Sequence, residues 1–599
     1  MRKCKGNSKA TWKILREIVP NGKQSGKNCT FENENEKAEE FNRFFGNVGE
    51  NAFLESKGDC NSNISPETHR RHNHSDSSEG NSALFRPEPV DRHTVILTIK
   101  HLHETKSFGS DNIALKFIKD SLNVIIYFLI TIINTSIVTG KFPASWKHAV
   151  VTPLHKSGDS NVANNYRPIS LLPIFSKIIE KIVSNQLVSF LETNKIISNS
   201  QHGYRPKLST QTALTVITDK IYDNMDNKRI SLLTLCDLSK AFDSVNHNIL
   251  LNKLLQNNID YFWFESYLCE RTQSVRINNT VSSKIPVNFG VPQGSILGPI
   301  LFNIFVNDMP IHINNCLLVQ YADDTQFLHS GNINNLNTLI TKSEETFENA
   351  KKYFQKNGLL LSTGKTKCIF IGTRQLISQI PNDITIQFGN DKISPSIYIK
   401  SLGAHFDQYM TFDKHISHII RKVMGTLLDI NRTKNCFDKS SRISVVQSLV
   451  LSVINYCNVI WGTTNMSLIA KIQKVQNFAA RVADGKARKY DHVTPILNEL
   501  QWLNVTKTIV MYSTITVFKQ VTHHYPDHYL PLPTVNRMTD STTRQQDQLY
   551  VPMTRTDTGS RALSIRGPKL WNQLPLNIKD SNNLHMFKSK LRKYLLTNS

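Results

Sequence analysis

The feature that most constrains the fold of this chain is a pair of adjacent aspartates, Asp323 and Asp324. Residues 318–322 and 325–327 on either side are mostly apolar or β-favouring, which predicts a short hairpin with the aspartates at its turn. Unpaired carboxylates at an apolar turn are costly unless a cation joins them, and a metal ion is the usual one. Asp-Asp pairs also occur in ordinary solvated turns. The pair alone therefore leaves both interpretations open.

Length and charge limit the classes of protein to consider. The chain has 599 residues, enough for about three or four domains at roughly 150 residues each. Lys plus Arg number 71 against 48 for Asp plus Glu, a net charge of +23. Such an excess suits a polyanionic partner, either nucleic acid or an anionic membrane surface, and general solubility is the plainer alternative. We favour nucleic acid because the excess is so large.

The cysteines and the apolar segments indicate an intracellular protein. The nine cysteines are scattered and form no Cys-x-x-Cys pair, which argues against a disulfide framework and a zinc site and favours a reducing compartment. We find no signal peptide. Residues 122–138 are strongly apolar but contain Asn123, Asn134 and Thr135, and they fall short of the roughly 20 residues that a bilayer requires. We therefore expect a buried core helix there and no membrane span.

The N-terminal part divides into two segments. Residues 1–60 carry charged residues and phenylalanines at helical spacing, which predicts a helical N-terminal extension. Residues 61–86 contain few apolar side chains, which predicts a disordered linker. The chain reads as globular from residue 87 onward.

Several charged or polar side chains stand at the ends of predicted strands. Lys156 follows a strand within 147–159, and Arg167 belongs to a second extended piece at 165–172. Either cation alone would be an ordinary surface residue. Residues 230–236 form a nearly continuous apolar run, typical of a strand buried on both faces, and this run ends in Asp237.

A rigid loop is predicted at residues 290–299, which contain three glycines and two prolines. Pro299 would occupy the first position of a helix, where its missing N–H does no harm. Gln293 is thereby fixed at the entrance of that helix. Residues 273–289 before the loop predict a hairpin that turns at Asn278 and Asn279.

An ordered series of motifs connects these pieces. It comprises LHKSGD (154–159), YRPISLL (166–172), QHGYR (201–205), DLSKAFDSVNH (237–247), GVPQGSILGPILFNIFVND (290–308), YADD (321–324), KTK (365–367) and SLGAHFD (401–407). In this order and spacing the series resembles the reverse transcriptases of non-LTR retrotransposons, the jockey-like group in particular. The resemblance is close from about residue 147 to 407 and looser on the flanks.

The resemblance implies an α+β fold with the right-hand polymerase architecture of fingers, palm and thumb, the palm containing a small antiparallel sheet. The expected domains are listed by residue range: 1–60 helical extension, 61–86 linker, 87–136 helical fingers extension, 137–407 fingers and palm, 408–534 helical thumb-like region, 535–599 linker and C-terminal tail. The implied activity is RNA-directed DNA synthesis, in which deoxynucleotides are added to a DNA primer on an RNA template. The implied location is a retroelement ribonucleoprotein in the cytoplasm and nucleus.

The resemblance also implies a metal-dependent site. Two Mg²⁺ ions about 3.5–4 Å apart activate the primer hydroxyl and stabilise the leaving pyrophosphate in such reactions, and Mn²⁺ is a possible substitute. Asp237 and Asp323 would be the shared ligands, since hard cations prefer carboxylate oxygens. Asp324 would contribute less, because neighbouring strand residues point to opposite faces.

Further roles follow from motif positions. Lys156 and Arg167 match the positions that hold the incoming triphosphate, for which the planar fork of Arg is suited. Gln293 and Gly294 match the border of the nucleotide sugar and base. Lys365, with Lys367 as the alternative, matches the loop lysine that protonates pyrophosphate, although Ser362 replaces the usual Asn before it. Leu402 and Gly403 match the turn that supports the primer end.

The resemblance implies that Phe242, next to Asp243, bears on which sugar the enzyme would accept. Phe242 matches the bulky aromatic that would clash with a 2′-OH, and a plain core phenylalanine is the alternative. Asp243 resembles the second acid of RNA-dependent RNA polymerases, which contacts the ribose. Phe242 and the Tyr-Ala-Asp-Asp hairpin favour deoxynucleotides over that alternative.

Two other expectations concern the chain as a whole. Complete elements of this group carry an upstream endonuclease, and none is recognisable before residue 87, so we expect a truncated reading frame without target-nicking activity. A decayed element that binds RNA or duplex without catalysis is the rival hypothesis, although its catalytic motifs are intact. Helices after residue 407 carry basic residues that suit a thumb following a duplex backbone, or simply a solvated face: Lys414, Arg421, Lys422, Lys471, Lys474 and Arg481.

Overall fold

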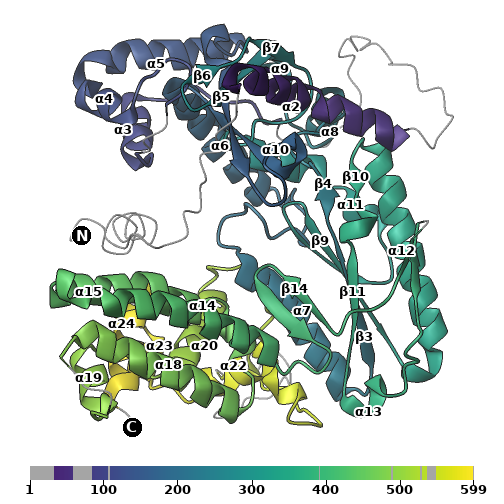
Figure 1. Cartoon of the computed structure of the whole chain (residues 1–599), viewed down its shortest axis with the longest axis vertical. Helices are drawn as coiled ribbons and strands as arrows, with labels where there is room; N and C mark the ends of the chain where they lie inside the picture. The colour runs from purple at the N-terminus through teal and green to yellow at the C-terminus, as the bar shows by residue number, and fades with distance from the viewer. Residues whose placement is uncertain are drawn as a thin grey trace.

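A computed structural model describes residues 33–57, 84–104, 108–389, 391–486, 490–526, 529–535 and 548–597. Helices and several small sheets alternate along the chain, which agrees with the α+β class (Figure 1). Residues 1–32 and most of the predicted linker lie outside the described residues. Leu84 to Arg86, the last residues of that linker range, are described, and Phe85 is buried with its backbone N–H bonded to Asn258.

The first half of the chain alternates helices with short strands. In chain order they are α2 (Glu34–Lys57), α3 (Arg92–His101), α4 (Leu115–Asp120), α5 (Leu122–Thr139), β1 (His148–His155), β2 (Tyr166–Leu171), α6 (Ile174–Thr193), α7 (Thr210–Asp226), β3 (Ile230–Cys236), β4 (Leu238–Ser239), α8 (His247–Gln256), α9 (Phe262–Leu268), β5 (Arg271–Ile277), β6 (Thr280–Val281), β7 (Ile285–Val287) and α10 (Gly298–Phe305).

The second half contains the predicted hairpin and then becomes helical. Its elements are α11 (Met309–His312), β8 (Leu317–Tyr321), β9 (Asp324–Gly331), α12 (Leu336–Lys356), β10 (Leu360–Leu361), η5 (Thr363–Lys365), β11 (Lys367–Ile371), α13 (Arg374–Ile377), β12 (Ile386–Phe388), β13 (Asp391–Ile393), β14 (Tyr398–Ser401), β15 (Ala404–Asp407), α14 (Asp413–Arg432), α15 (Lys439–Val446), the π-helical turn η7 (Gln447–Leu451), α16 (Ser452–Asn455), α17 (Asn458–Trp461), α18 (Met466–Asp484), α19 (Val493–Glu499), α20 (Val505–Val521), α22 (Leu563–Asn572), α23 (Leu576–Lys579) and α24 (Leu584–Thr597).

An antiparallel sheet of four strands, in the order β11-β3-β9-β8, carries the acidic motifs. Strand β3 lies inside this sheet, and all of its residues except Leu235 are buried, which confirms the prediction of a strand covered on both faces. The β8–β9 pairing ends at Tyr321 and Asp324, so the predicted hairpin is confirmed.

A second sheet is formed by β2, β1, β5 and β6, with β7 added to β5. Helix α2, which precedes the motif series, lies along this sheet (Figure 1). Its Phe41 and Phe45 pack with Val151 and Val275 in one small core. The N-terminal extension is therefore joined to the sheet by apolar contacts, in addition to hydrogen bonds such as that from Asn42 to Ser283 at 2.8 Å.

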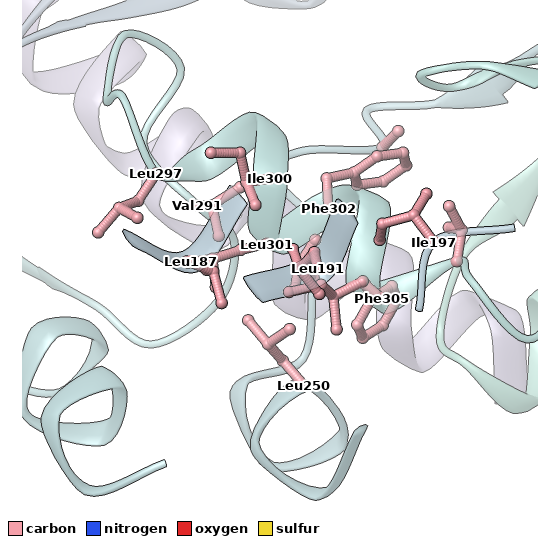
Figure 2. Packing of buried hydrophobic residues seen from close by; sticks show 14 of the residues in the cluster. Leu187, Leu191, Ile197, Leu250, Val291, Leu297, Ile300, Leu301, Phe302 and Phe305 are labelled. Carbon is pink, nitrogen blue, oxygen red and sulfur yellow. The ribbon is translucent and has the colours of Figure 1, made fainter. Parts of the chain in front are cut away.

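Helix α10 forms the centre of the largest hydrophobic core. Figure 2 shows Leu187 and Leu191 of α6 and Leu250 of α8 gathered around the side chains of α10. Leu301, Phe302 and Phe305 of α10 are fully buried. Pro299 stands at the start of the helix, as the sequence predicted.

Helix α5 is only half buried, which corrects the expectation of a core helix. Ile126 and Ile133 pack inside, whereas Val124 and Phe128 on the opposite face are 73% and 72% exposed. Among the described helices, α5 is the one long and apolar enough to cross a membrane by length and composition. The apolar run misled the prediction because hydropathy counts residues without regard to which face meets another element.

The C-terminal helices form a bundle beside the four-stranded sheet (Figure 1). Helices α14 and α18 share one core with α7. The tail returns to α7, where Asp219 accepts hydrogen bonds from the backbone N–H groups of Leu563 and Ser564. Trp571, for which the sequence suggested no role, packs in a core with Phe518 and Phe587.

Candidate active site

Three aspartates meet at one end of the four-stranded sheet. The β3–β9 ladder ends with Cys236 opposite Thr325, so the next residues on the two strands are Asp237 and Asp324. Asp323 belongs to the tight turn between β8 and β9. The structure thus brings together the carboxylates that are separated by more than eighty positions in the sequence.

A loop from elsewhere in the chain supports the Asp323 turn. Gln201 accepts a hydrogen bond from the backbone N–H of Ala322 at 2.9 Å and donates one to the Ala322 carbonyl at 3.3 Å. A Cβ on Gly203 would collide with the backbone nitrogen of Ala322. Ala322 itself has φ +58°, a conformation that non-glycine residues rarely adopt. Gln201 was not predicted as a site residue, although the QHGYR motif contains it.

The carboxylates are electrostatically coupled. Burial raises the pKa of Asp323 and repulsion from Asp237 adds to the effect, while Arg167 and Lys156 act in the opposite direction. Burial, together with Asp323 and Asp237, raises the pKa of Asp324 to about 6. The Asp324 side chain still reaches solvent. The site therefore concentrates negative charge that a cation would stabilise.

Lys156 and Arg167 lie on one hairpin that faces the aspartates. Strands β1 and β2 pair so that Leu154 stands opposite Arg167, and the N–H of Lys156 bonds to the Asn165 carbonyl at 2.8 Å. Both cationic side chains are exposed, and both lower the pKa of Asp323. Two exposed cations beside the carboxylates are suited to a polyphosphate.

Lys365 contacts the carboxylate of Asp237 directly in this structure. Its Nζ lies 3.3 Å from Oδ2 of Asp237. Lys367, the alternative, begins β11 and pairs with Leu235 in the sheet. Ser362, which replaces the usual Asn, donates its backbone N–H to the Asp237 carbonyl at 3.0 Å and so fixes the loop to the end of β3.

Gln293 is held from two sides. Its side-chain amide donates to both oxygens of Asp243, at 2.9 and 2.7 Å, and its carbonyl accepts from Ser170 at 2.8 Å. A Cβ on Gly294, whose φ is +138°, would collide with the Ser170 carbonyl. Burial raises the pKa of Asp243 to about 6, against the opposing effect of its Gln293 hydrogen bonds. The Asp243 carboxylate is therefore already hydrogen-bonded to Gln293. An acid that contacts the ribose, as in the RNA polymerase alternative, would need these oxygens for the nucleotide.

Phe242 is half-buried on the active-site side of α10. Its ring stacks on Phe302 with centroids 4.8 Å apart, and the ring of Tyr204 meets it edge-on at 6.3 Å. Tyr204 is 52% exposed, and Asp323 and Tyr321 contribute to raising its pKa, after burial. The core-phenylalanine alternative thus describes the stacking of Phe242 on Phe302, while the exposed Tyr204 also meets the Phe242 ring.

Leu402 and Gly403 form the turn between β14 and β15. Both have left-handed backbone angles, with φ +44° and +86°. The carbonyl of Leu402 accepts a hydrogen bond of 2.6 Å from the phenol of Tyr456 at the end of α16. Tyr456 was not among the predicted site residues, and no motif in the sequence pointed to it.

The carboxylates at this sheet end have the chemistry of a divalent-metal site. Three carboxylates at one sheet end are the hard oxygen ligands that Mg²⁺ prefers. Burial, and after it the neighbouring carboxylates, raise the pKa values of Asp323 and Asp324, and a bound cation would stabilise their ionised forms. In the part of the chain that the structure describes, no three His, Cys, Asp or Glu side chains are grouped tightly enough to hold an ion as they stand. The chemistry of the donors fits a metal, and binding would require the carboxylates to draw together.

Comparison with known proteins identifies the motif-bearing region. A family profile described as "Reverse transcriptase (RNA-dependent DNA polymerase)" matches residues 154–406. The "RNA-directed DNA polymerase from mobile element jockey" of Drosophila melanogaster is 28% identical over 390 residues, which cover 63% of this chain and 41% of the relative. The "Probable RNA-directed DNA polymerase from transposon BS" of the same species is 30% identical over 409 residues, covering 66% and 44%.

The chain spans less than half the length of these curated relatives. Among solved structures, a telomerase of Candida tropicalis with a fragment of telomeric RNA aligns over 62% of each chain, at 12% identity and a TM-score of 0.33. That likeness is too distant to add to the argument. The motif order, the profile match and the retrotransposon relatives agree with one another, and residues 154–406 are a reverse transcriptase domain similar to those of the jockey-like non-LTR retrotransposons.

Proposed function

We propose that this chain is an RNA-directed DNA polymerase that adds deoxynucleotides to the 3′ end of a DNA primer on an RNA template. The observation that carries the proposal is the meeting of Asp237 with the Asp323 turn at one end of a buried antiparallel sheet, opposite Lys156 and Arg167. Carboxylates on one side and cations on the other are the arrangement that nucleotidyl transfer requires.

In this proposal the four-stranded sheet with α7 is the palm. The β1–β2 hairpin, the sheet containing it and α3 to α6 are the fingers, and the helices from α14 to α20 are the thumb. Helix α2 is an extension that braces the fingers sheet, and the C-terminal segment closes the thumb onto α7 through Asp219. The partners would be an RNA template, a DNA primer and deoxynucleoside triphosphates, within a retroelement ribonucleoprotein.

Asp237 and Asp323, with Asp324 beside them, would hold the divalent ions. Such ions, when bound, lower the pKa of the attacking hydroxyl and stabilise charge on the pyrophosphate. Lys156 and Arg167 bind the triphosphate, and Arg167 can do so through two parallel hydrogen bonds. Gln293 borders the nucleotide, with its amide nitrogen committed to Asp243. Lys365, already 3.3 Å from Asp237, is placed to give a proton to the leaving pyrophosphate.

Phe242 supports the choice of deoxynucleotides. Its ring is fixed on Phe302 and cannot retreat into the filled core around α10, so a 2′-OH above it would meet a rigid surface. The ribonucleotide alternative is weakened because the Asp243 carboxylate is already bonded to Gln293.

The test is primer extension with Mg²⁺, an RNA template, a DNA primer and each nucleotide set. We expect deoxynucleotide-dependent extension by the wild type and none by Asp323→Asn. Asp383→Asn makes the same chemical change on an exposed residue and should extend normally. Failure of the wild type to extend, with tight template–primer binding retained, would refute the polymerase and favour a protein that only binds nucleic acid.

A further inference from the structure

The Leu402–Gly403 turn depends on contacts from outside its own hairpin. Strands β14 and β15 form a separate two-stranded sheet, and such hairpins are marginally stable alone. Leu402 has φ +44°, which costs free energy for a residue with a side chain. The turn therefore keeps this shape only where surrounding groups hold it.

Tyr456 supplies such contacts from the thumb-like region. Its hydroxyl lies 2.6 Å from the Leu402 carbonyl. Its ring lies so close to Gly403 that an added Cβ would stand 3.1 Å from the ring. The side chain is 39% exposed, so it reaches the surface where the turn does.

Thr210 ties the same phenol to a third segment. The Thr210 hydroxyl lies 3.1 Å from the Tyr456 oxygen. Since a phenol carries one proton, the shorter bond uses it for Leu402, and the Thr210 hydroxyl can donate in return. Thr210 is the first residue of α7, and α7 packs against β3 and β8, the strands that lead to Asp237 and Asp323.

We propose that Tyr456 is a positioning residue, which fixes the Leu402–Gly403 turn relative to α7 and so places the primer 3′ end at the catalytic aspartates. This inference rests on the proposed function, because the role of the turn in supporting the primer comes from that proposal. One side chain thereby joins the turn, the palm helix and the end of α16.

The phenol of Tyr456 keeps the proton that it donates to the Leu402 carbonyl over the working pH range. Burial raises the pKa of Tyr456 to about 12, and neighbouring Cys457 and Tyr321 add to the rise. The π-helical turn Gln447–Leu451 lies just before α16 in the chain. Such turns occur frequently at functional sites.

Two measurements on Tyr456→Phe test the proposal. The first follows a 2-aminopurine at the primer 3′ end of an RNA–DNA template–primer, whose fluorescence reports the placement of that base without any chemistry. The second is single-nucleotide incorporation. We expect the fluorescence change on binding to shrink and kcat to fall about three- to tenfold, the order expected for one lost hydrogen bond, with KM for dNTP unchanged.

Tyr512→Phe is the matched control, because Tyr512 lines the same cavity of about 440 Å³ as Tyr456. It should behave as the wild type in both measurements. Anisotropy of a label at the far end of the duplex measures overall affinity. Tyr456→Phe should leave this affinity within about twofold, because the lost hydrogen bond joins two parts of the protein and the ring that packs on Gly403 is retained.

The outcomes separate this inference from the proposed function. A wild type that fails to extend primers, combined with a fluorescence change that Tyr456→Phe reduces, would remove the polymerase and keep the positioning role. An unaltered fluorescence change in Tyr456→Phe would overturn the positioning role whatever the extension assay gives. A variant that loses only thermal stability and overall affinity would show a purely structural tyrosine and would overturn it too.

Discussion

Replacing Asp243 by asparagine should weaken nucleotide use through Gln293, although Asp243 itself faces the protein. In the wild type the Gln293 amide donates to both oxygens of an ionised carboxylate, at 2.9 and 2.7 Å. Asparagine offers one neutral acceptor and an NH₂ group that cannot accept. Gln293 would therefore lose its fixed orientation at the nucleotide.

The magnitude follows from the difference between the two kinds of hydrogen bond. Bonds to charged groups contribute about 1.5–3 kcal/mol and neutral ones about 0.5–1.5 kcal/mol. A loss of about 1–1.5 kcal/mol corresponds to a fall in kcat/KM for dNTP of about 5- to 12-fold. Gln293→Ala should cost at least as much, and the double variant should add little, because both changes remove one interaction.

The pH dependence gives a sharper test. Burial raises the pKa of Asp243 to about 6, so the carboxyl is ionised at pH 8 and protonated near pH 5. A protonated aspartate and an asparagine are both neutral and of similar shape. The ratio of wild-type to Asp243→Asn kcat/KM should therefore be largest at pH 8 and approach one near pH 5.

The ratio is the quantity to measure, because the titration of the other active-site groups affects both proteins and cancels. Steady-state incorporation of one dNTP between pH 5 and 8 provides it, with Asp383→Asn as the control. A ratio that stays constant across this range, or an Asp243→Asn enzyme with wild-type kcat/KM at pH 8, would refute the role given to the Asp243–Gln293 pair.

Three further predictions concern the site. Phe242→Ala should relax sugar discrimination, seen as a lower ratio of kcat/KM for dNTP over rNTP, and an unchanged ratio would remove its assigned role. Lys365→Ala should lower kcat by about 100-fold if Lys365 is a general acid, with little change in KM, whereas Lys367→Ala should not; the reverse result would move the role to Lys367. Asp324→Asn should raise the melting temperature at pH 7 in the absence of divalent metal. The pKa of Asp324 is raised to about 6 in the folded protein, so its contribution to stability is present below its unfolded pKa and is lost as pH rises through about 6. At pH 7 the ionised Asp324 therefore destabilises the fold, and the neutral asparagine does not. The gain in melting temperature should vanish near pH 4, and an equal gain at both pH values would contradict the assigned repulsion.

The sequence alone determined much of the framework. Strand β3 has the predicted bounds, residues 230–236, and α10 begins where Pro299 predicted a helix start, because each carries its own local pattern and end signals. The sequence also predicted the strand that ends at Asp237, the hairpin at Asp323 and the loop that holds Gln293. Each is flanked by residues typical of its structure, either β-favouring apolar residues or glycines and prolines.

Only the tertiary structure decided which of these pieces meet. The Gln201 support of the Asp323 turn, the Asp243–Gln293 pair and the Tyr456 bond to Leu402 each join segments that are about 50 to 120 positions apart. The exposed face of α5 and the hydrogen bond from the C-terminal segment to Asp219 could not be predicted from the sequence either. Local pattern fixes what an element is, because helices and strands depend on neighbouring residues along the chain. The partner of a buried polar group depends on the packing of the whole chain, which a single sequence does not display.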